Sequence, residues 1–219
     1  MKNKLLLAVL AGVGVLAAFA AGVYFYNASE SKKLSELARG NDTVLVRPHS
    51  PTQGAADAKV VLVEFLDPAC ETCAQFYPLV KDIVRESRGK VRLVVRYAAF
   101  HKGSDEAVKI LEATRKQGLY WFALEAAMKS QPMWAAHHNP QPQRLWELFA
   151  GSSLNVEQAR QDASSPDIAK ILVQDGADVQ ALNVRQTPTF FVNGKPLKKF
   201  GLAELKTLVD DEMKIQYGS

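Results

Sequence analysis

Cysteine and histidine are scarce in this chain, which has only two cysteines and four histidines in 219 residues. A scaffold held together by several disulfides is therefore excluded. An excess of one charge is also missing, because the formal net charge is +4 and two of those charges are Lys2 and Lys4, which leaves +2 for the rest. Nucleic-acid-binding proteins usually carry a denser basic surface, so this class is set aside. With 47% hydrophobic and 23% charged residues, the chain is not disordered as a whole.

A long uncharged run stands at the amino terminus. A short basic segment, residues 1–4, precedes residues 5–26, which contain no charged side chain. A helix of this length crosses about 30 Å of hydrocarbon, so the run predicts a transmembrane anchor. The alternative is a signal peptide cleaved near Ala20, but the run exceeds the roughly 7–15 apolar residues of a usual signal core. In both cases the rest of the chain is expected to be exported.

The chain after the apolar run divides into a tether and one domain. Residues 27–55 are polar and broken by proline and glycine, so we expect a linker. A short helix at Ser31–Arg39 and a brief strand at Thr43–Arg47 are expected within it. The folded domain is expected over residues 56–219, which is long enough to bury a core without disulfides.

Hydrophobic periodicity indicates an α/β domain. Val60–Leu66 and Val91–Tyr97 are apolar runs rich in β-branched residues, which predict buried strands. A helical pattern lies between them, so the strands should be parallel and joined by a right-handed crossover. Residues 104–182 change to helical periodicity and predict a helical insertion. A hairpin at Asn193-Gly194 and a helix from Leu202 should complete the domain.

The two cysteines form a Cys-x-x-Cys pair, Cys70-Glu71-Thr72-Cys73, at the point where the first strand gives way to a helix. Unpaired N–H groups and the positive end of a helix stabilise a thiolate, lowering a thiol pKa from about 8.5 to roughly 3.5–7.5. Cys70 would then be an exposed nucleophile. Cys73, one turn further on, would be close enough to attack a mixed disulfide and release the partner.

Other interpretations of the cysteine pair have less support. A c-type haem site needs histidine after the second cysteine, and residue 74 is alanine. A zinc site needs two more ligands, and no His-x₃₋₅-His pair occurs among His49, His101, His137 and His138. A structural disulfide over so short a loop would add little stability. The alternative functions are a metal-handling or client-binding protein whose dithiol chelates a soft ion such as Cu(I), and an interaction module with an incidental cysteine pair.

Together these features resemble the DsbA-like branch of the thioredoxin-fold disulfide oxidoreductases, over about residues 56–215. The cysteine pair follows a strand, and Glu64 stands six residues before Cys70. A helical insertion separates the two halves of the core. The segment Val184–Thr189, before the hairpin, is similar to the cis-proline loop of that family.

The resemblance implies a role for each matching residue. Cys70 would be the attacking thiolate, and Cys73 the buried resolving thiol. Glu64 would be a carboxyl buried beneath Cys73, with a raised pKa, that relays the proton of Cys73 during exchange. Pro188 would follow a cis peptide bond and lie against the disulfide. Thr187, before it, would pair through its backbone with an extended substrate peptide.

The residues between the cysteines depart from the pattern of the strongest oxidants in the branch, which have Pro-His there. Glu71 and Thr72 would instead face the substrate. The negative charges of Glu71 and Asp67 should oppose a thiolate on Cys70 and make its pKa less depressed. A less stabilised reduced form means a weaker oxidant.

The resemblance also implies partners and a location. Exported proteins with cysteines would be the substrates, and an external redox protein would reset the dithiol, because the chain has no second cysteine pair. No metal and no cofactor beyond the Cys70–Cys73 disulfide is implied. Oxidase or isomerase activity is favoured, with reductase activity also open. We expect a bacterial inner-membrane protein with a single pass over residues 5–26 and its catalytic domain in the periplasm, or a soluble periplasmic protein after cleavage near Ala20.

Overall fold

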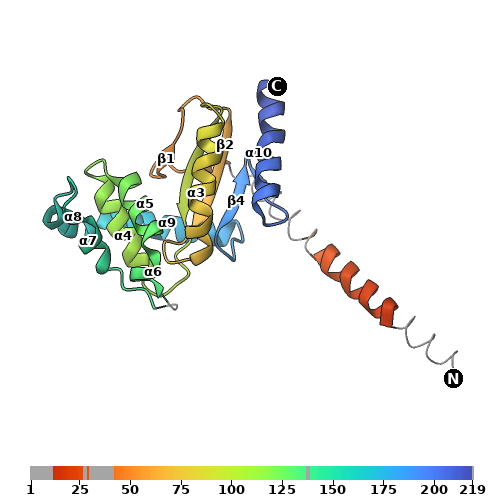
Figure 1. The fold of residues 1–219 in the computed structure, drawn as a ribbon, viewed down its shortest axis with the longest axis horizontal. Helices are drawn as coiled ribbons and strands as arrows, with labels where there is room; N and C mark the ends of the chain where they lie inside the picture. Colours follow the sequence, from red (N-terminus) through yellow and green to blue (C-terminus); the bar gives the residue numbers. More distant parts are fainter. Residues whose placement is uncertain (1–11, 27–28, 30–41, 137–138, 219) are drawn as a thin grey trace.

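One mixed β-sheet organises the domain (Figure 1). The structure is a computed structural model that describes residues 12–26, 29, 42–136 and 139–218. Five strands are hydrogen-bonded in the order β1-β3-β2-β4-β5. Their bounds are Thr52–Gln53 for β1, Val60–Leu66 for β2, Val91–Tyr97 for β3, Thr189–Val192 for β4 and Lys195–Pro196 for β5. The two strands expected from apolar runs are therefore confirmed as β2 and β3.

The central strand β2 has a parallel neighbour on one side and an antiparallel neighbour on the other. β2 and β3 pair in parallel, with Val60 opposite Val91, and α3 (Glu71–Glu86) connects them as expected. β4 lies antiparallel to β2, and β5 follows β4 across a tight turn. Asn193 and Gly194 both have positive φ, 46° and 76°, as the turn of a two-residue hairpin requires.

Each face of the sheet is covered by helices. Side chains alternate along β2, so Leu62 and Leu66 pack in the cluster with α3 and α10 (Leu202–Tyr217), whereas Val63 and Phe65 face the opposite side. There they meet Val179 and Leu182 at the end of α9 (Pro166–Ala181). Figure 1 shows α3 and α10 side by side along the sheet.

The expected helical insertion between β3 and β4 is confirmed. Its helices are α4 (Ser104–Arg115), α5 (Tyr120–Lys129), α6 (Gln131–Trp134), α7 (Arg144–Phe149), α8 (Val156–Ala163) and α9. Figure 1 shows α4 to α8 gathered on the side of α3 away from α10. Buried aromatic side chains, including Trp134, Trp146 and Phe149, fill the interior of this block and join it to the main core.

Residues 42–55 belong to the folded domain, so the expected linker over residues 27–55 is too long. α2 (Asp42–Leu45) is a helix where the sequence predicted a strand at Thr43–Arg47, and β1 pairs with β3, with Thr52 opposite Val94. Arg96, fully buried on β3, donates hydrogen bonds to the carbonyl oxygens of Val44 and Leu45. The helix expected at Ser31–Arg39 lies outside the described residues.

A buried network of charges holds this amino-terminal segment in place. The guanidinium of Arg96 contacts Asp175 at 2.7 Å and Asp178 at 2.6 Å, both on α9. Arg47 donates two hydrogen bonds to Asp178, and His49 lies 2.6 Å from Asp175. Burial acts to raise the pKa of both aspartates, but these partners outweigh it and hold the pKa of each below its usual value. The polar residues that suggested a linker are therefore the ones that attach the segment.

Residues 12–26 form an exposed helix. Within the described part of the chain, no helix is both long enough and apolar enough to cross a membrane. Residues 1–4, and residues 5–11 of the expected span, lie outside the described residues.

The charge network generates a prediction for stability. Asp175→Asn should lower the free energy of unfolding by about 3 kcal/mol, because it removes part of the charge that compensates the buried Arg96. Urea denaturation at neutral pH measures this loss. Asp167→Asn is the matched control on the same helix, where an exposed ion pair joins Asp167 to Lys170, and it should unfold like the wild type. Equal losses in the two variants would contradict the account.

Candidate redox site

The two cysteines lie at the amino-terminal end of α3, directly after β2. Cys70 is the N-cap residue with an extended backbone (φ −77°, ψ 118°), and Cys73 is one turn into the helix. Both are reduced thiols. Cys73 is 0% exposed, as the sequence predicts, and Cys70 is 7% exposed. Cys70 is thus less open than the expected exposed nucleophile, because the Thr187–Pro188 loop lies against its sulfur.

The surroundings of Cys70 favour its thiolate. A hydrogen bond from the side chain of Cys73 is the largest influence, and it lowers the pKa of Cys70 against the opposing effect of burial. The side chain of Thr187 and the backbone N–H groups of Cys73 and Thr72 lower it further, so the pKa falls to about 5. These N–H groups belong to the first turn of α3, where helix donors have no partner within the helix. At neutral pH the sulfur of Cys70 is therefore charged.

Cys73 has the opposite character. Burial raises the pKa of Cys73 strongly, and its hydrogen bond to Cys70 and the nearby charge of Glu64 raise it further. The structure therefore pairs one acidic thiol with one that stays protonated. Only the Cys70 sulfur is equipped to act as a nucleophile at neutral pH.

Glu64 lies in the middle of the sheet, on β2 between Val95 of β3 and Phe190 of β4. The residue is 1% exposed, and its Oε2 atom has no hydrogen-bond partner. Burial, together with the negative charge of Cys70, raises the pKa of Glu64 to about 8. The expectation of a buried carboxyl with a raised pKa near Cys73 is confirmed.

The loop before β4 completes the site. The Thr187–Pro188 peptide bond is cis, as the sequence predicts. In its protonated form, the Cys70 thiol donates to the carbonyl oxygen of Thr187 at 3.3 Å. Because β4 pairs with β2, this loop comes to the end of β2 from which α3 begins. The sheet thus brings together all the residues that the sequence placed in the site.

Asp67, which was expected to oppose the charge of Cys70, is held through its carboxylate by five hydrogen-bond contacts. It is fully buried and accepts hydrogen bonds from the backbone N–H groups of Ala69, Phe100 and His101 at 2.7–2.9 Å. The hydroxyl of Ser104 and the ring of His101 complete its shell. The carboxylate therefore faces the loop after β3. Neither Asp67 nor Glu71 is among the largest influences on the pKa of Cys70.

Gln131 is a site residue that the sequence did not indicate. It begins α6, is 3% exposed, and its side-chain amide donates to the carbonyl oxygens of Pro68 and Cys70, both at 2.9 Å. A glutamine next to a proline at the start of a short helix does not predict a contact with the backbone of Pro68 and Cys70. Its partners lie more than sixty residues earlier in the chain.

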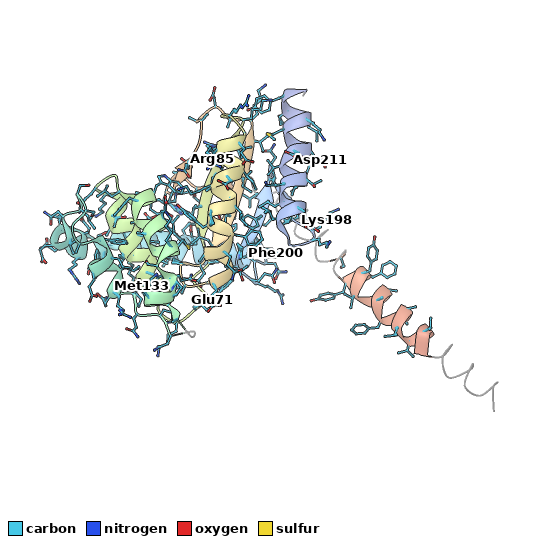
Figure 2. All side chains as sticks on the ribbon, in the orientation of Figure 1. Glu71, Arg85, Met133, Lys198, Phe200 and Asp211 are labelled. Carbon is cyan, nitrogen blue, oxygen red and sulfur yellow. The ribbon has the colours of Figure 1, made fainter. Side chains whose placement is uncertain are left out.

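Apolar side chains and a groove surround the cysteine pair. In Figure 2, Met133 and Phe200 lie on opposite sides of the α3 end that carries Glu71. They are 58% and 42% exposed, and the ring of Phe200 packs on Phe76 at 4.7 Å. A groove of about 630 Å³ runs between α3 and α6, lined in part by Glu71, Gln75, Met128 and Pro132.

A zinc site finds no support in the described part of the chain. Within it, no group of three or more histidine, cysteine, aspartate or glutamate side chains is placed to hold a metal ion. The two thiols alone would supply two ligands, whereas zinc needs four.

Proteins of similar sequence and structure agree with this geometry. The family model described as "Thioredoxin" matches residues 47–211. Disulfide bond formation protein D of Bacillus subtilis is 29% identical over 193 residues, 80% of this chain and 84% of that protein. A thioredoxin-like oxidoreductase from Silicibacter pomeroyi has the same fold, with a TM-score of 0.67 and 27% identity over 79% of this chain and 97% of that one.

Part of a larger protein also matches. The Na(+)/H(+) antiporter NhaA of Herminiimonas arsenicoxydans is 30% identical over 146 residues, which is 67% of this chain. The chain spans only 22% of that antiporter's length. The model match, the relatives and the cysteine geometry together show that the chain belongs to the thioredoxin family, as a DsbA-like member.

Proposed function

We propose that this protein is a thiol-disulfide oxidoreductase that exchanges disulfides with exported, cysteine-containing proteins. The observation that carries the proposal is the unequal pair of sulfurs, an acidic Cys70 at the start of α3 and a buried Cys73 with a raised pKa. A nucleophile with a pKa below neutral and a protected resolving thiol are what thiol-disulfide exchange requires. The similarity to a disulfide bond formation protein over most of both chains supports it.

In the oxidising direction, the reaction starts from a Cys70–Cys73 disulfide. A client thiolate attacks the sulfur of Cys70, the Cys70–Cys73 bond breaks, and the electron pair leaves on the sulfur of Cys73, which takes up a proton. A second client thiolate then attacks the client sulfur of the mixed disulfide. The client leaves as a disulfide, and Cys70 leaves as a thiolate. Two electrons have passed to the protein, and the reverse sequence reduces a client.

Glu64 is the proton donor and acceptor for Cys73 in this proposal. Cys73 needs a proton when it leaves as a thiolate and must lose one before it can attack. Glu64 lies close enough to affect the pKa of Cys73, and its own pKa of about 8 allows both protonation states near neutral pH. No other carboxyl in the described residues is among the main influences on Cys73.

The client peptide is proposed to lie across the Thr187–Pro188 loop. An extended peptide beside Thr187 would add backbone hydrogen bonds next to the Cys70 sulfur. Glu71, which is exposed, and Thr72, which is half-buried, stand on the other side of the sulfur and would meet the client's flanking residues. Pro188 itself offers no N–H donor, so the pairing groups come from its neighbours.

Membrane attachment and location are part of the proposal. Residues 5–26 would anchor the domain to the bacterial inner membrane, on the periplasmic side, where disulfides persist. An external redox partner would restore the disulfide after each oxidation. A Cys70 thiolate stabilised to a pKa of about 5 stabilises the reduced form of the pair, which favours oxidase or isomerase activity.

Cys73→Ala tests the assigned roles. This variant keeps the nucleophile but cannot resolve a mixed disulfide, so it should accumulate a Cys70-linked adduct when incubated with a disulfide-containing peptide. Mass spectrometry under non-reducing conditions detects the adduct. Cys70→Ala is the matched control and should form almost none, because its remaining thiol is buried and protonated. Equal adduct in both variants, or none in either, would contradict the proposal.

The titration of Glu64 gives a second prediction. Its pKa rises from 4.5 to about 8 on folding, so the folded protein binds this proton more tightly than the unfolded chain. Stability must then fall as pH rises from about 4.5 to about 8, and the cost stays constant above that window. In Glu64→Gln this loss of stability should be absent. The free energy of unfolding of the variant should therefore rise relative to that of the wild type by up to about 1.4 kcal/mol per pH unit across this window.

Denaturation of the reduced protein at pH values across this window measures the gain. Glu157→Gln, an exposed change on α8, is the control and should follow the wild type at every pH. Parallel stability profiles for the wild type and Glu64→Gln would show that Glu64 does not titrate in this window.

A further inference from the structure

The turn before Cys70 leaves carbonyl oxygens close to the reactive sulfur. Residues 67–70 connect β2 to α3, and the N–H of Cys70 bonds to the carbonyl oxygen of Asp67 at 3.0 Å. The carbonyl oxygen of Cys70 accepts the first helical hydrogen bond, from Ala74 at 3.1 Å. Pro68, Ala69 and Cys70 are all buried, so water cannot readily solvate the carbonyl groups of this turn.

The side chain of Gln131 reaches these carbonyl groups from the helical insertion. Its Nε2 atom lies 2.9 Å from the carbonyl oxygens of both Pro68 and Cys70, so each of its two N–H bonds has an acceptor. The backbone of Gln131 is itself held, because its carbonyl oxygen accepts from Ala135 at 2.7 Å. Trp134, one turn further on, donates to the carbonyl oxygen of Ala127 at 2.8 Å. The amide is therefore presented from a well-packed helix.

We propose that Gln131 is a positioning residue, whose amide holds the Pro68 and Cys70 carbonyl groups so that the Cys70 sulfur stays aligned with the first turn of α3 and the Thr187 loop. This inference rests on the proposed exchange function. It gives the helical insertion an indirect part in the chemistry, because Gln131 belongs to the insertion and bonds to the backbone of Cys70.

Two effects of the Gln131 amide both favour the thiolate form of Cys70. By fixing the carbonyl group of Cys70, it fixes the peptide plane between Cys70 and Glu71, from which the first turn of α3 continues to the N–H groups of Thr72 and Cys73 that lower the pKa of Cys70. It also offsets the negative ends of two carbonyl dipoles that lie within two residues of a thiolate. Without the amide, both dipoles would disfavour the charged sulfur. A purely structural role, joining the insertion to the core, would affect folding but not the acidity of Cys70.

Gln131→Met separates these roles, because methionine is close to glutamine in length and flexibility but donates no hydrogen bond. We expect the pKa of Cys70, read from the ultraviolet absorbance of the thiolate, to rise by about one unit, as loss of groups that favour the charged form requires. The equilibrium constant for exchange with glutathione should shift up to tenfold toward the disulfide form of the protein.

Trp134→Phe is the matched control. It removes one hydrogen bond to a backbone carbonyl from a side chain that is 1% exposed, on the same helix, without touching Cys70. This variant should lose stability and keep the Cys70 pKa of the wild type. A folded Gln131→Met protein with an unchanged Cys70 pKa would overturn the inference, as would an equal pKa rise in Trp134→Phe.

Gln131→Leu is the second variant if the methionine protein does not fold. Leucine also removes both N–H donors, so the Cys70 pKa should again rise by about one unit, and an unchanged value would overturn the inference. A different result would contradict the proposed function itself. A wild-type protein that does not exchange with glutathione contradicts that function, whereas normal exchange by the wild type with no effect of Gln131→Met contradicts only the role of Gln131.

Discussion

The Cys70 sulfur lies 3.3 Å from the carbonyl oxygen of Thr187, and this contact joins segments 117 residues apart in the chain. It forms because β4 pairs with β2, so the loop before β4 meets the end of β2 where α3 begins. The long helical insertion follows β3 and ends before β4, so it does not interrupt the pairing of β4 with β2. The Cys70 sulfur has to lie between the start of α3 and the Thr187–Pro188 loop. The rest of the domain is arranged so that these two segments meet.

Solvation makes the two sulfurs unequal. Cys70 keeps a small exposed area and donors from the first turn of α3, whereas Cys73 is enclosed by the core. Glu64 is enclosed as well, and its buried, unpartnered oxygen costs stability that a leucine would not. A carboxyl held in the centre of a sheet at this cost is explained by its position beside a thiol that must gain and lose a proton. Glu64 therefore lowers the stability of the domain at a position where the chemistry of the cysteine pair needs a carboxyl group.

Local patterns in the sequence predicted the strands, the crossover helix, the helical insertion and the hairpin, because each rests on periodicity or turn residues within a short window. Cys70, Cys73, Glu64 and the cis Thr187–Pro188 bond could be assigned by resemblance. The contact of Gln131 with Cys70 could not be predicted, because it joins residues with no shared pattern. The same holds for the buried network of Arg96, Asp175 and Asp178, which binds Arg47 and His49 of the segment whose polar composition favoured a linker. Buried polar networks depend on which segments meet, and that is decided by the whole fold.

The central claim is that this fold makes Cys70 a thiolate at neutral pH while Cys73 stays protonated. Titration of the reduced wild-type protein, followed by the ultraviolet absorbance of the thiolate, tests it most directly. The account predicts one transition with a pKa of about 5, lost in Cys70→Ala and kept in Cys73→Ala at a higher pKa, since Cys73 supplies the largest stabilising hydrogen bond. A wild-type protein with no thiolate below the ordinary thiol pKa of about 8.5 would contradict it.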